Sequence, residues 1–279
     1  MDQHFSETKA IADSFDGMLS HFSIATIDSL LEFQNARGIT GDVLEIGVFR
    51  GKSAAVLARR MAKTETLHLY DISDQLDRAR LAAIGVPSKY SIVDSAELKK
   101  RDLAELRRAM RFCHIDASHR FEATIYELSI ADYVLADDGI VSLDDYANLN
   151  YSQILAATFK YLFTRHTDLT IFLVTQEKAY LCRKAMFDTY ALFVLDHLQK
   201  AMADRAVPET CLAKTDEARE YRAFHLRRRQ PGEGDRYSEQ IYGPFYEIER
   251  RPLTRKQRIW QRLPPAVQQQ LQAWRTFRQ

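Results

Sequence analysis

The chain has 279 residues, of which 46% are hydrophobic and 28% are charged, an ordinary composition for a folded protein with a sizeable core. Its 39 lysine and arginine residues nearly balance its 38 aspartate and glutamate residues, so no global field favours a nucleic acid or an anionic surface as a partner. The sequence begins without a basic stretch followed by an apolar one, and it contains no apolar run of about 18 residues. We therefore expect a cytoplasmic protein without a membrane span, whose three cysteines, lacking metal-ligand spacing, are free thiols.

Apolar runs alternate with helical patterns through the middle of the chain. The five runs with strand character are residues 43–49, 66–71, 90–95, 111–116 and 139–145. Strands that alternate with helices predict a doubly wound α/β fold, in which helices cover both faces of a parallel sheet. The later segment TDLTIFLVTQEKAYLCRK holds two more β-rich runs separated only by TQEK, which predicts a hairpin that adds an antiparallel strand.

We expect four parts: a helical N-terminal cap at 1–38, a Rossmann-like core at 39–184, a core-associated helical and loop extension at 185–249, and a basic tail at 250–279. The apolar segment 185–200 either packs in the core or covers a partner subunit, so a homo-oligomer is one of two open interpretations. The tail contains basic residues and two tryptophans but no acid. It either binds a nucleic acid or another anionic partner, or packs its tryptophans on the body of the protein.

The expected first strand ends in a glycine turn. In doubly wound sheets, ligands bind beyond the carboxyl ends of the strands, so the residues at these ends are the candidates for function. Glu45, Gly47 and Gly51 form an E-x-G-x-x-x-G pattern that leads into a helix and allows a ligand to approach the backbone closely. The pattern does not match the G-x-G-x-x-G fingerprint of dinucleotide-binding proteins. A tight turn without a ligand is the alternative interpretation.

Polar residues also end the second and third expected strands. Asp71 could accept both hydroxyl groups of a ribose, as acids at this position do in nucleotide-binding folds. Asp94 and Ser95 could bind an adenine. All three are also residue types that commonly cap the next helix, so both interpretations stay open for each.

The fourth and fifth expected strands end in carboxylates. Asp116 follows one, and Asp144 with Asp145 follows the other. If the strands are neighbours, about 4.8 Å apart, three negative charges meet in a small volume. Such crowding raises a pKa or requires a cation, and a divalent ion held by carboxylate oxygens is the natural compensation. The alternative is that these aspartates cap helices or face solvent.

His119 comes three residues after Asp116, at the expected start of a helix. We expect the positive end of the helix dipole to keep its imidazole neutral, so that it can accept a proton near pH 7. Beside a metal ion that holds a hydroxyl group, such an imidazole can act as a general base. An exposed first-turn histidine without a function is the alternative, and we interpret His114, inside the strand, as structural.

The segments EIGVFRG, LYD, HIDASH and GIVSLDDY together resemble the class I S-adenosyl-L-methionine-dependent methyltransferases. More specifically, they are similar to the metal-dependent sugar and natural-product O-methyltransferases of the macrocin O-methyltransferase type. The resemblance implies a Rossmann-like, mostly parallel seven-stranded sheet whose final strand is antiparallel. It also implies that Glu45, Gly47 and Gly51 hold the methionine and ribose parts of S-adenosyl-L-methionine, and that Asp71 holds the ribose.

The resemblance further implies that Asp116, Asp144 and Asp145 ligate a divalent metal, Mg²⁺ in the relatives, and that the catalytic base falls on His119 beside Asp116. The expected activity is methyl transfer to a hydroxyl group of a small molecule, either a sugar or a natural product. The acceptor stays open, because ANLNYSQ after the paired aspartates matches no element of the family. A nicotinamide-dependent oxidoreductase and a catalytically silent binding protein are the alternatives.

Overall fold

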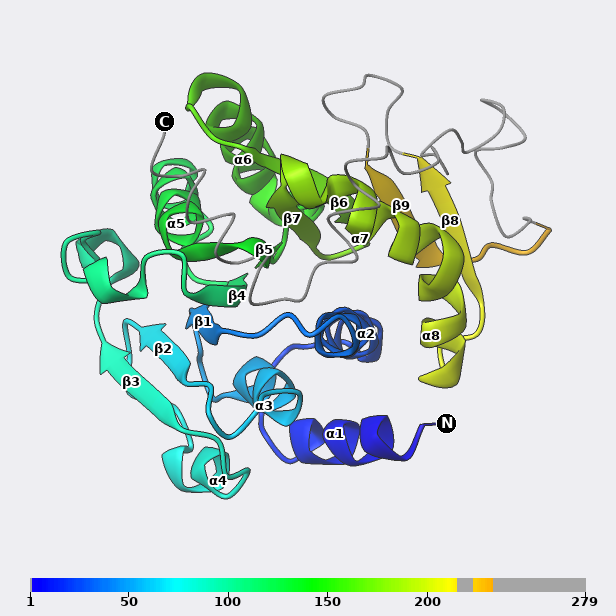
Figure 1. Ribbon diagram of the computed structural model, residues 1–279, viewed down its shortest axis with the longest axis horizontal. Helices are drawn as coiled ribbons and strands as arrows, with labels where there is room; N and C mark the ends of the chain where they lie inside the picture. Colours follow the sequence, from blue (N-terminus) through cyan, green and yellow to red (C-terminus); the bar gives the residue numbers. More distant parts are fainter. Residues whose placement is uncertain (1, 215–222, 233–279) are drawn as a thin grey trace, which may run out of the picture. The chain divides into compact units, whose positions relative to one another are not determined.

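The computed structural model describes residues 2–214 and 223–232, which form one nine-stranded sheet with the order β3-β2-β1-β4-β5-β7-β6-β9-β8 (Figure 1). The strands are β1 Asp42–Ile46, β2 Leu67–Asp71, β3 Ser88–Ile92, β4 Met110–Ile115, β5 Leu135–Leu143, β6 Leu169–Val174, β7 Ala179–Arg183, β8 Thr210–Lys214 and β9 Phe224–Arg228. Strands β1 to β5 are parallel, and β7 lies antiparallel between β5 and β6. The predicted doubly wound fold with an antiparallel hairpin strand is therefore confirmed.

The sheet has two more strands than the predicted seven. Strand β9 pairs in parallel with β6 and antiparallel with β8, within the segment for which we expected only helices and loops. Both strands end in basic residues, Lys214 in β8 and Arg227 with Arg228 in β9. Strand β8 lies at the edge of the sheet, where charged residues are typical. In both strands the basic residues shorten the apolar run on which the predicted strand count was based.

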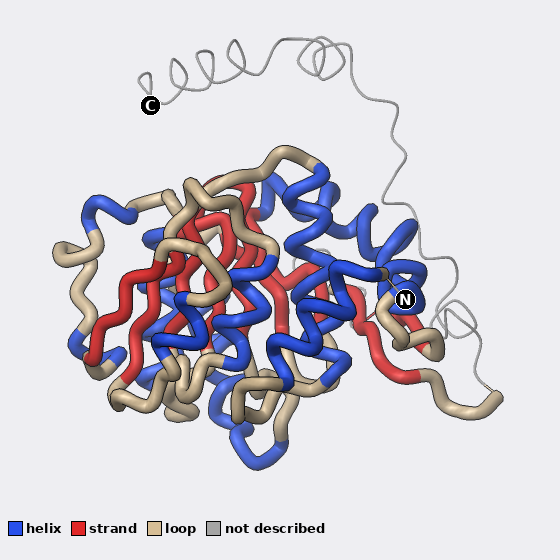
Figure 2. Tube along the Cα trace, turned by 90° about the horizontal axis from the view of Figure 1, so that it is seen from below, coloured by secondary structure: helices blue, strands red, loops and turns tan. Residues whose placement is uncertain are grey.

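Helices cover both faces of the sheet. They are α1 Gln3–Asp13, α2 His21–Ala36, α3 Lys52–Arg59, α4 Arg78–Ala82, α5 Phe121–Val134, α6 Ser152–Thr164, α7 Phe187–Phe193 and α8 Gln199–Asp204. Helices α1, α2 and α3 lie on one face and α5 with α6 on the other (Figure 1); seen from below, helices lie in front of the strands (Figure 2). Every residue of β4 is buried, as expected for a parallel strand covered on both sides.

The apolar segment after β7 is part of the core. Its helix α7 continues through a π-helical turn, Val194–Leu198, into α8, and Tyr190 and Val194 are fully buried. The ring of Tyr190 stacks on Phe172 of β6 with the ring centres 4.9 Å apart. Of the two interpretations of this segment, the structure thus shows packing in the core.

Three further predictions concern the cysteines, a membrane span and the C-terminal tail. All three cysteines are buried free thiols. Within the described residues, no helix combines the length and the apolar character needed to cross a membrane. The basic tail at 250–279 lies outside the described residues.

Buried charges fix α2 to the rest of the protein. Asp28 of α2 is fully buried, and its carboxylate accepts hydrogen bonds from Arg60 and Arg205, each with an Nε–O distance of 2.7 Å. A buried carboxylate is costly without such partners. Just before α2, the Ser20 hydroxyl donates to Glu177 in the β6–β7 turn over 2.8 Å. The start of α2 and the β6–β7 turn are therefore held together.

Candidate active site

The ends of β1, β4 and β5 meet at one edge of the sheet. The amide of Asp116 donates to the carbonyl oxygen of Ile46 over 2.8 Å, and the amide of Asp144 donates to that of Ile115 over 2.9 Å. These bonds extend the ladder one residue beyond each strand. They bring Gly47, Asp116 and Asp144 together, as the sequence predicts.

Both glycines of the turn after β1 are required by the backbone. Gly47 has φ +85°, and a Cβ atom there would lie 1.9 Å from the carbonyl oxygen of Asp116. Gly51 has φ +96° at the start of α3, and a Cβ atom there would lie 2.5 Å from Cδ1 of Leu76. Only glycine combines this conformation with so close an approach. The turn therefore lies directly against the segment that carries Asp116.

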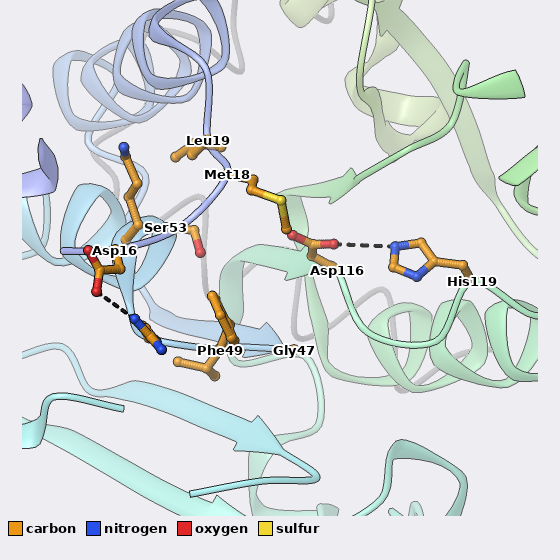
Figure 3. Close-up of a pocket in the computed structure, with 12 residues that line it drawn as sticks. Asp16, Met18, Leu19, Gly47, Phe49, Ser53, Asp116 and His119 are labelled. Carbon is orange, nitrogen blue, oxygen red and sulfur yellow. Dashed lines mark hydrogen bonds and ion pairs between the residues drawn. The ribbon is translucent and has the colours of Figure 1, made fainter. Parts of the chain in front are cut away.

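A cavity of about 190 Å³ opens beside this turn (Figure 3). Its walls are residues 16–19 of the α1–α2 loop, residues 47–50 of the turn with the start of α3, and Asp116 with His119. The N-terminal helical cap thus supplies one wall of the cavity. Asp116, one of the three predicted metal ligands, thus lines the cavity together with His119.

Asp71 holds the glycine turn in place through hydrogen bonds. Its Oδ2 atom accepts hydrogen bonds from the amides of Val48 and Phe49, each over 2.7 Å. Its Oδ1 atom accepts from the amide and the hydroxyl of Ser73 over 2.8 and 2.9 Å. A carboxylate has about four acceptor positions, so both oxygen atoms are engaged within the chain. This arrangement positions the turn, and the ribose contact stays a prediction.

We expect the Asp71→Asn variant to lose about 2 kcal/mol of stability and to bind S-adenosyl-L-methionine at least tenfold more weakly. The asparagine side chain keeps one oxygen atom that accepts hydrogen bonds. Its NH₂ group replaces the other oxygen, so the backbone amides of either the turn or Ser73 become buried donors without an acceptor. Urea unfolding and calorimetric titration measure the two effects. Asp74→Asn is the matched control, since Asp74 forms only an exposed ion pair with Arg78. Equal effects in the two variants would refute this role of Asp71.

The other predicted cofactor residues have partners within the chain. The Asp94 side chain caps the short helical turn that follows it, as the helix-cap interpretation expects. The Ser95 hydroxyl donates to Glu127 over 2.7 Å. Glu45 is fully buried, and its Oε1 atom lies 2.8 Å from Nδ1 of His114. In this structure, Glu45 therefore presents no exposed atom to a ligand in the cavity.

The three predicted metal ligands lie close together but fall into two groups. Ligand atoms of His114, Asp116 and Asp144 lie within 4.8 Å of one another, and so do those of Asp116, His119 and Asp145. Asp145 has φ +53°, and its Oδ2 atom lies 3.0 Å from Nε2 of His119. Asp145 is thus associated with His119, whereas Asp144 is associated with His114.

A buried lysine compensates part of this negative charge. Nζ of Lys178, which follows the β6–β7 turn, lies 2.5 Å from Oδ1 of Asp144, and only 1% of the lysine side chain is exposed. Burial raises the pKa of Asp144, and the charge of Asp116 adds to this rise while Lys178 opposes it. Burial also acts to raise the pKa of Asp116, but His119 and Lys178 outweigh it and hold that pKa well below its usual range.

The donor atoms of the cluster fit a divalent ion. Carboxylate oxygen and imidazole nitrogen are common ligands of such ions. Nε2 of His114 is fully buried and has no hydrogen-bond partner among the described residues, so one polar position of the cluster is unfilled. Lys178 would compete with an ion for Asp144, but it pairs with only one of the two carboxylate oxygens.

His119 differs from the prediction in its position and in the charges around it. It lies before Arg120, the N-cap of α5, and therefore outside the helix. Its Nε2 atom is 3.0 Å from Asp145 and 3.7 Å from Asp116, and its ring stacks on Tyr151 with the ring centres 4.1 Å apart. The interaction with Asp116 is the main cause that raises the pKa of His119, against the effect of burial. The adjacent carboxylates therefore act in the direction opposite to the effect that we expected from the helix dipole.

Three residues of the site were missed in the sequence. Met18 lines the cavity, Tyr151 stacks on His119, and Lys178 pairs with Asp144. Met18 and Tyr151 lie in segments without a recognisable motif, and Lys178 lies in the TQEK stretch predicted as a hairpin turn. Only the antiparallel register of β7, in which Ala179 pairs with Leu143, brings this lysine to the end of β5.

Residues 44–146 match the family model described as "Methyltransferase domain". The matched segment begins in β1 and ends just after Asp145, so it contains the glycine turn and the whole predicted metal site. The match and the strand order agree with the fold expected from the sequence. Residues 44–146 are therefore similar to a methyltransferase domain.

Comparison with solved structures finds the following similar proteins. The TDP-rhamnose 3'-O-methyltransferase CalS11 of calicheamicin biosynthesis is 16% identical over 64% of this chain and 93% of its own, with a TM-score of 0.47. Cofactor-bound Rv0187 from MTB is 16% identical over 66% and 91%, with a TM-score of 0.47. An O-methyltransferase from Bacillus cereus in complex with SAH is 14% identical over 65% and 90%, with a TM-score of 0.44. No curated protein matches the sequence. Likenesses at this level do not establish an acceptor.

Proposed function

We propose that this protein transfers the methyl group of S-adenosyl-L-methionine to a hydroxyl group of a small molecule, a sugar or a natural product as the sequence resemblance implies. The observation that carries the proposal is the position of His119, which lines the cavity beside the glycine turn and also contacts the carboxylate cluster. A proton acceptor therefore lies where a methyl donor in the cavity and an acceptor hydroxyl would meet.

In the proposed reaction, the acceptor oxygen attacks the methyl carbon while the bond from that carbon to sulfur breaks. Nε2 of His119 donates to the carboxylates, so the hydroxyl proton passes to the other ring nitrogen, Nδ1, and the products are a methyl ether and S-adenosylhomocysteine. The carboxylates of Asp145 and Asp116, which lie 3.0 and 3.7 Å from Nε2, stabilise the imidazolium that proton uptake creates. Because the sulfonium is already reactive, positioning and electrostatics account for most of the catalysis.

Side chains around the cavity would orient the donor and the acceptor. The turn at 47–51 approaches the donor through its backbone, and the α1–α2 loop encloses it from the opposite wall. Tyr151 holds the His119 ring in place by stacking and is itself 39% exposed, which leaves part of its ring for contact with the acceptor.

We include a divalent metal ion, expected to be Mg²⁺ from the resemblance, in the proposal. Asp116 and Asp144 would hold it, and a direct bond from Asp145 stays a prediction because that carboxylate pairs with His119 in this structure. When bound, such an ion lowers the pKa of a hydroxyl group next to it.

Isothermal titration with S-adenosyl-L-methionine tests the donor, and absence of binding at high micromolar concentrations would reject the proposed function. A screen of hydroxylated acceptors then tests the transfer itself.

We expect His119→Gln to lower kcat by about 100-fold or more, because general-base catalysis contributes at least that much, while donor affinity changes little. His166→Gln is the matched control, because His166 is exposed and outside the site. Unchanged kcat in His119→Gln would rule out the base.

A further inference from the structure

A row of buried polar residues crosses the sheet directly beneath the carboxylates. Glu45 of β1 is paired in register with His114 of β4, and His114 with Ser142 of β5. All three side chains are fully buried. Asp116 and Asp144 lie two residues further along β4 and β5, and because side chains alternate along a strand, they lie on the same face of the sheet. The His114 imidazole therefore lies on the same face of the sheet as the two carboxylates.

The hydrogen bond to Glu45 fixes the orientation of the His114 ring. Nδ1 lies 2.8 Å from Oε1 of Glu45, and because a carboxylate can only accept, Nδ1 is the donor in this bond. In the neutral imidazole, Nε2 then carries a lone pair. This nitrogen is buried and has no partner among the described residues. A lone pair buried within reach of two carboxylates is a position that a cation would stabilise.

We propose that His114 is a direct ligand of the divalent ion, and that it forms with Asp116 and Asp144 a site of one nitrogen and two carboxylates. This inference rests on the metal ion in the proposed function. Ligand atoms of the three residues lie within 4.8 Å of one another, which allows a single ion to contact all of them. Glu45 then acts as a positioning residue, since carboxylates that accept from the second ring nitrogen orient metal-binding histidines.

The occupancy of the Asp144 carboxylate supports this set of ligands. Its Oδ1 atom is taken by Lys178 and by the amide of Asp145, at 2.5 and 2.9 Å, so Oδ2 is the oxygen for an ion. Asp145 is directed to His119 and to the side-chain amide of Asn148, whose nitrogen lies 2.9 Å from Asp145 Oδ1. Of the two adjacent aspartates, Asp144 is therefore the proposed ligand, because its ligand atom lies close to that of His114.

The nitrogen ligand has a consequence for metal choice. Sites of carboxylates and water suit Mg²⁺, whereas imidazole suits transition metals such as Fe²⁺, Co²⁺ and Zn²⁺. A site that suits Mg²⁺ would have oxygen ligands alone. We therefore expect Mn²⁺ or Co²⁺ to bind to this site more tightly than Mg²⁺ does. Competition titrations measure this order of affinity, and tighter binding of Mg²⁺ would count against His114.

Electron spin echo spectroscopy of the Mn²⁺-loaded full chain tests the ligand directly, since a coordinated imidazole nitrogen modulates the echo of the metal. We expect ¹⁴N modulation in the wild-type protein and its persistence in His119→Gln, which removes the histidine of the other group. Absence of Mn²⁺ binding at millimolar metal, absence of the modulation, or its loss in His119→Gln would each overturn the assignment.

Two further variants complete this test. His114→Gln is expected to abolish the modulation, and Glu45→Gln to weaken Mn²⁺ binding by about tenfold or more while the modulation remains. If His114→Gln does not fold, the comparison of wild type with His119→Gln still decides. Metal binding is measured without methyl donor or acceptor. A protein that binds Mn²⁺ through His114 but does not bind S-adenosyl-L-methionine would reject the proposed function and leave this inference standing.

Discussion

Gly47→Ala is expected to abolish S-adenosyl-L-methionine binding and to lower the free energy of unfolding by about 3 kcal/mol or more. The new Cβ atom would lie 1.9 Å from the carbonyl oxygen of Asp116, in a backbone conformation with φ +85° that disfavours side chains. Relief requires the turn to move away from β4, or the segment with Asp116 to shift. Either movement changes the cavity wall that the turn and Asp116 share.

Gly85→Ala is the matched control for this variant. Gly85 has nearly the same φ, +83°, but nothing lies within 4 Å of the position of its Cβ atom. The cost there is that of the left-handed conformation alone, about 1 to 2 kcal/mol, without an effect on donor binding. Chemical denaturation and calorimetric titration measure both quantities. Normal binding of S-adenosyl-L-methionine by Gly47→Ala would contradict the prediction that donor binding depends on the close contact between the turn and Asp116.

The fold could be predicted from the sequence because its signals are local. Four of the first five strands contain a buried apolar run, whereas β3 is mostly exposed, and the TQEK stretch separates two β-rich runs. The pairing of β8 with β9 could not be predicted in the same way. It joins two short strands that end in basic residues, and β9 reaches the sheet through a parallel contact with β6 that no local pattern encodes.

The sequence predicts only the part of the site that follows from the position of the strand ends. Asp116 and Asp144 follow neighbouring strands, so their proximity follows from the fold class. The partners of each carboxylate depend on side chains from distant segments. Asp71 is engaged by the turn after β1, and Asp144 by a lysine from the β6–β7 hairpin. The sequence predicted that the crowded carboxylates require a cation; Lys178 supplies part of the positive charge, and the metal ion stays a prediction.

The two adjacent aspartates also differ in a way that sequence alone does not reveal. Asp144 is directed into the protein, where it contacts a buried ammonium group, whereas Asp145 has φ +53° and contacts the partly exposed His119. Backbone conformation rather than residue type separates their roles. The same substitution at the two positions should therefore have different consequences.

Asp144→Asn is expected to destabilise the protein by about 3 to 5 kcal/mol and to abolish metal-dependent turnover, while affinity for S-adenosyl-L-methionine is largely unchanged. The variant leaves the Lys178 ammonium group buried without a counter-charge, which costs far more than the loss of an exposed ion pair. Asp145→Asn is the matched control. Asparagine tolerates the left-handed backbone of this position, and the ion pair with His119 is partly exposed, so we expect a loss below about 1 kcal/mol.

Lys178→Met provides the second half of a double-mutant cycle. Alone, it leaves Asp144 as a buried carboxylate without the ammonium group. Combined with Asp144→Asn, it removes both charges, so the double variant should be more stable than the sum of the two single losses predicts, by about 2 kcal/mol. Urea unfolding of the four proteins gives this coupling energy. A coupling near zero would mean that Lys178 does not compensate Asp144, and that the negative charge of the cluster depends on a bound ion alone.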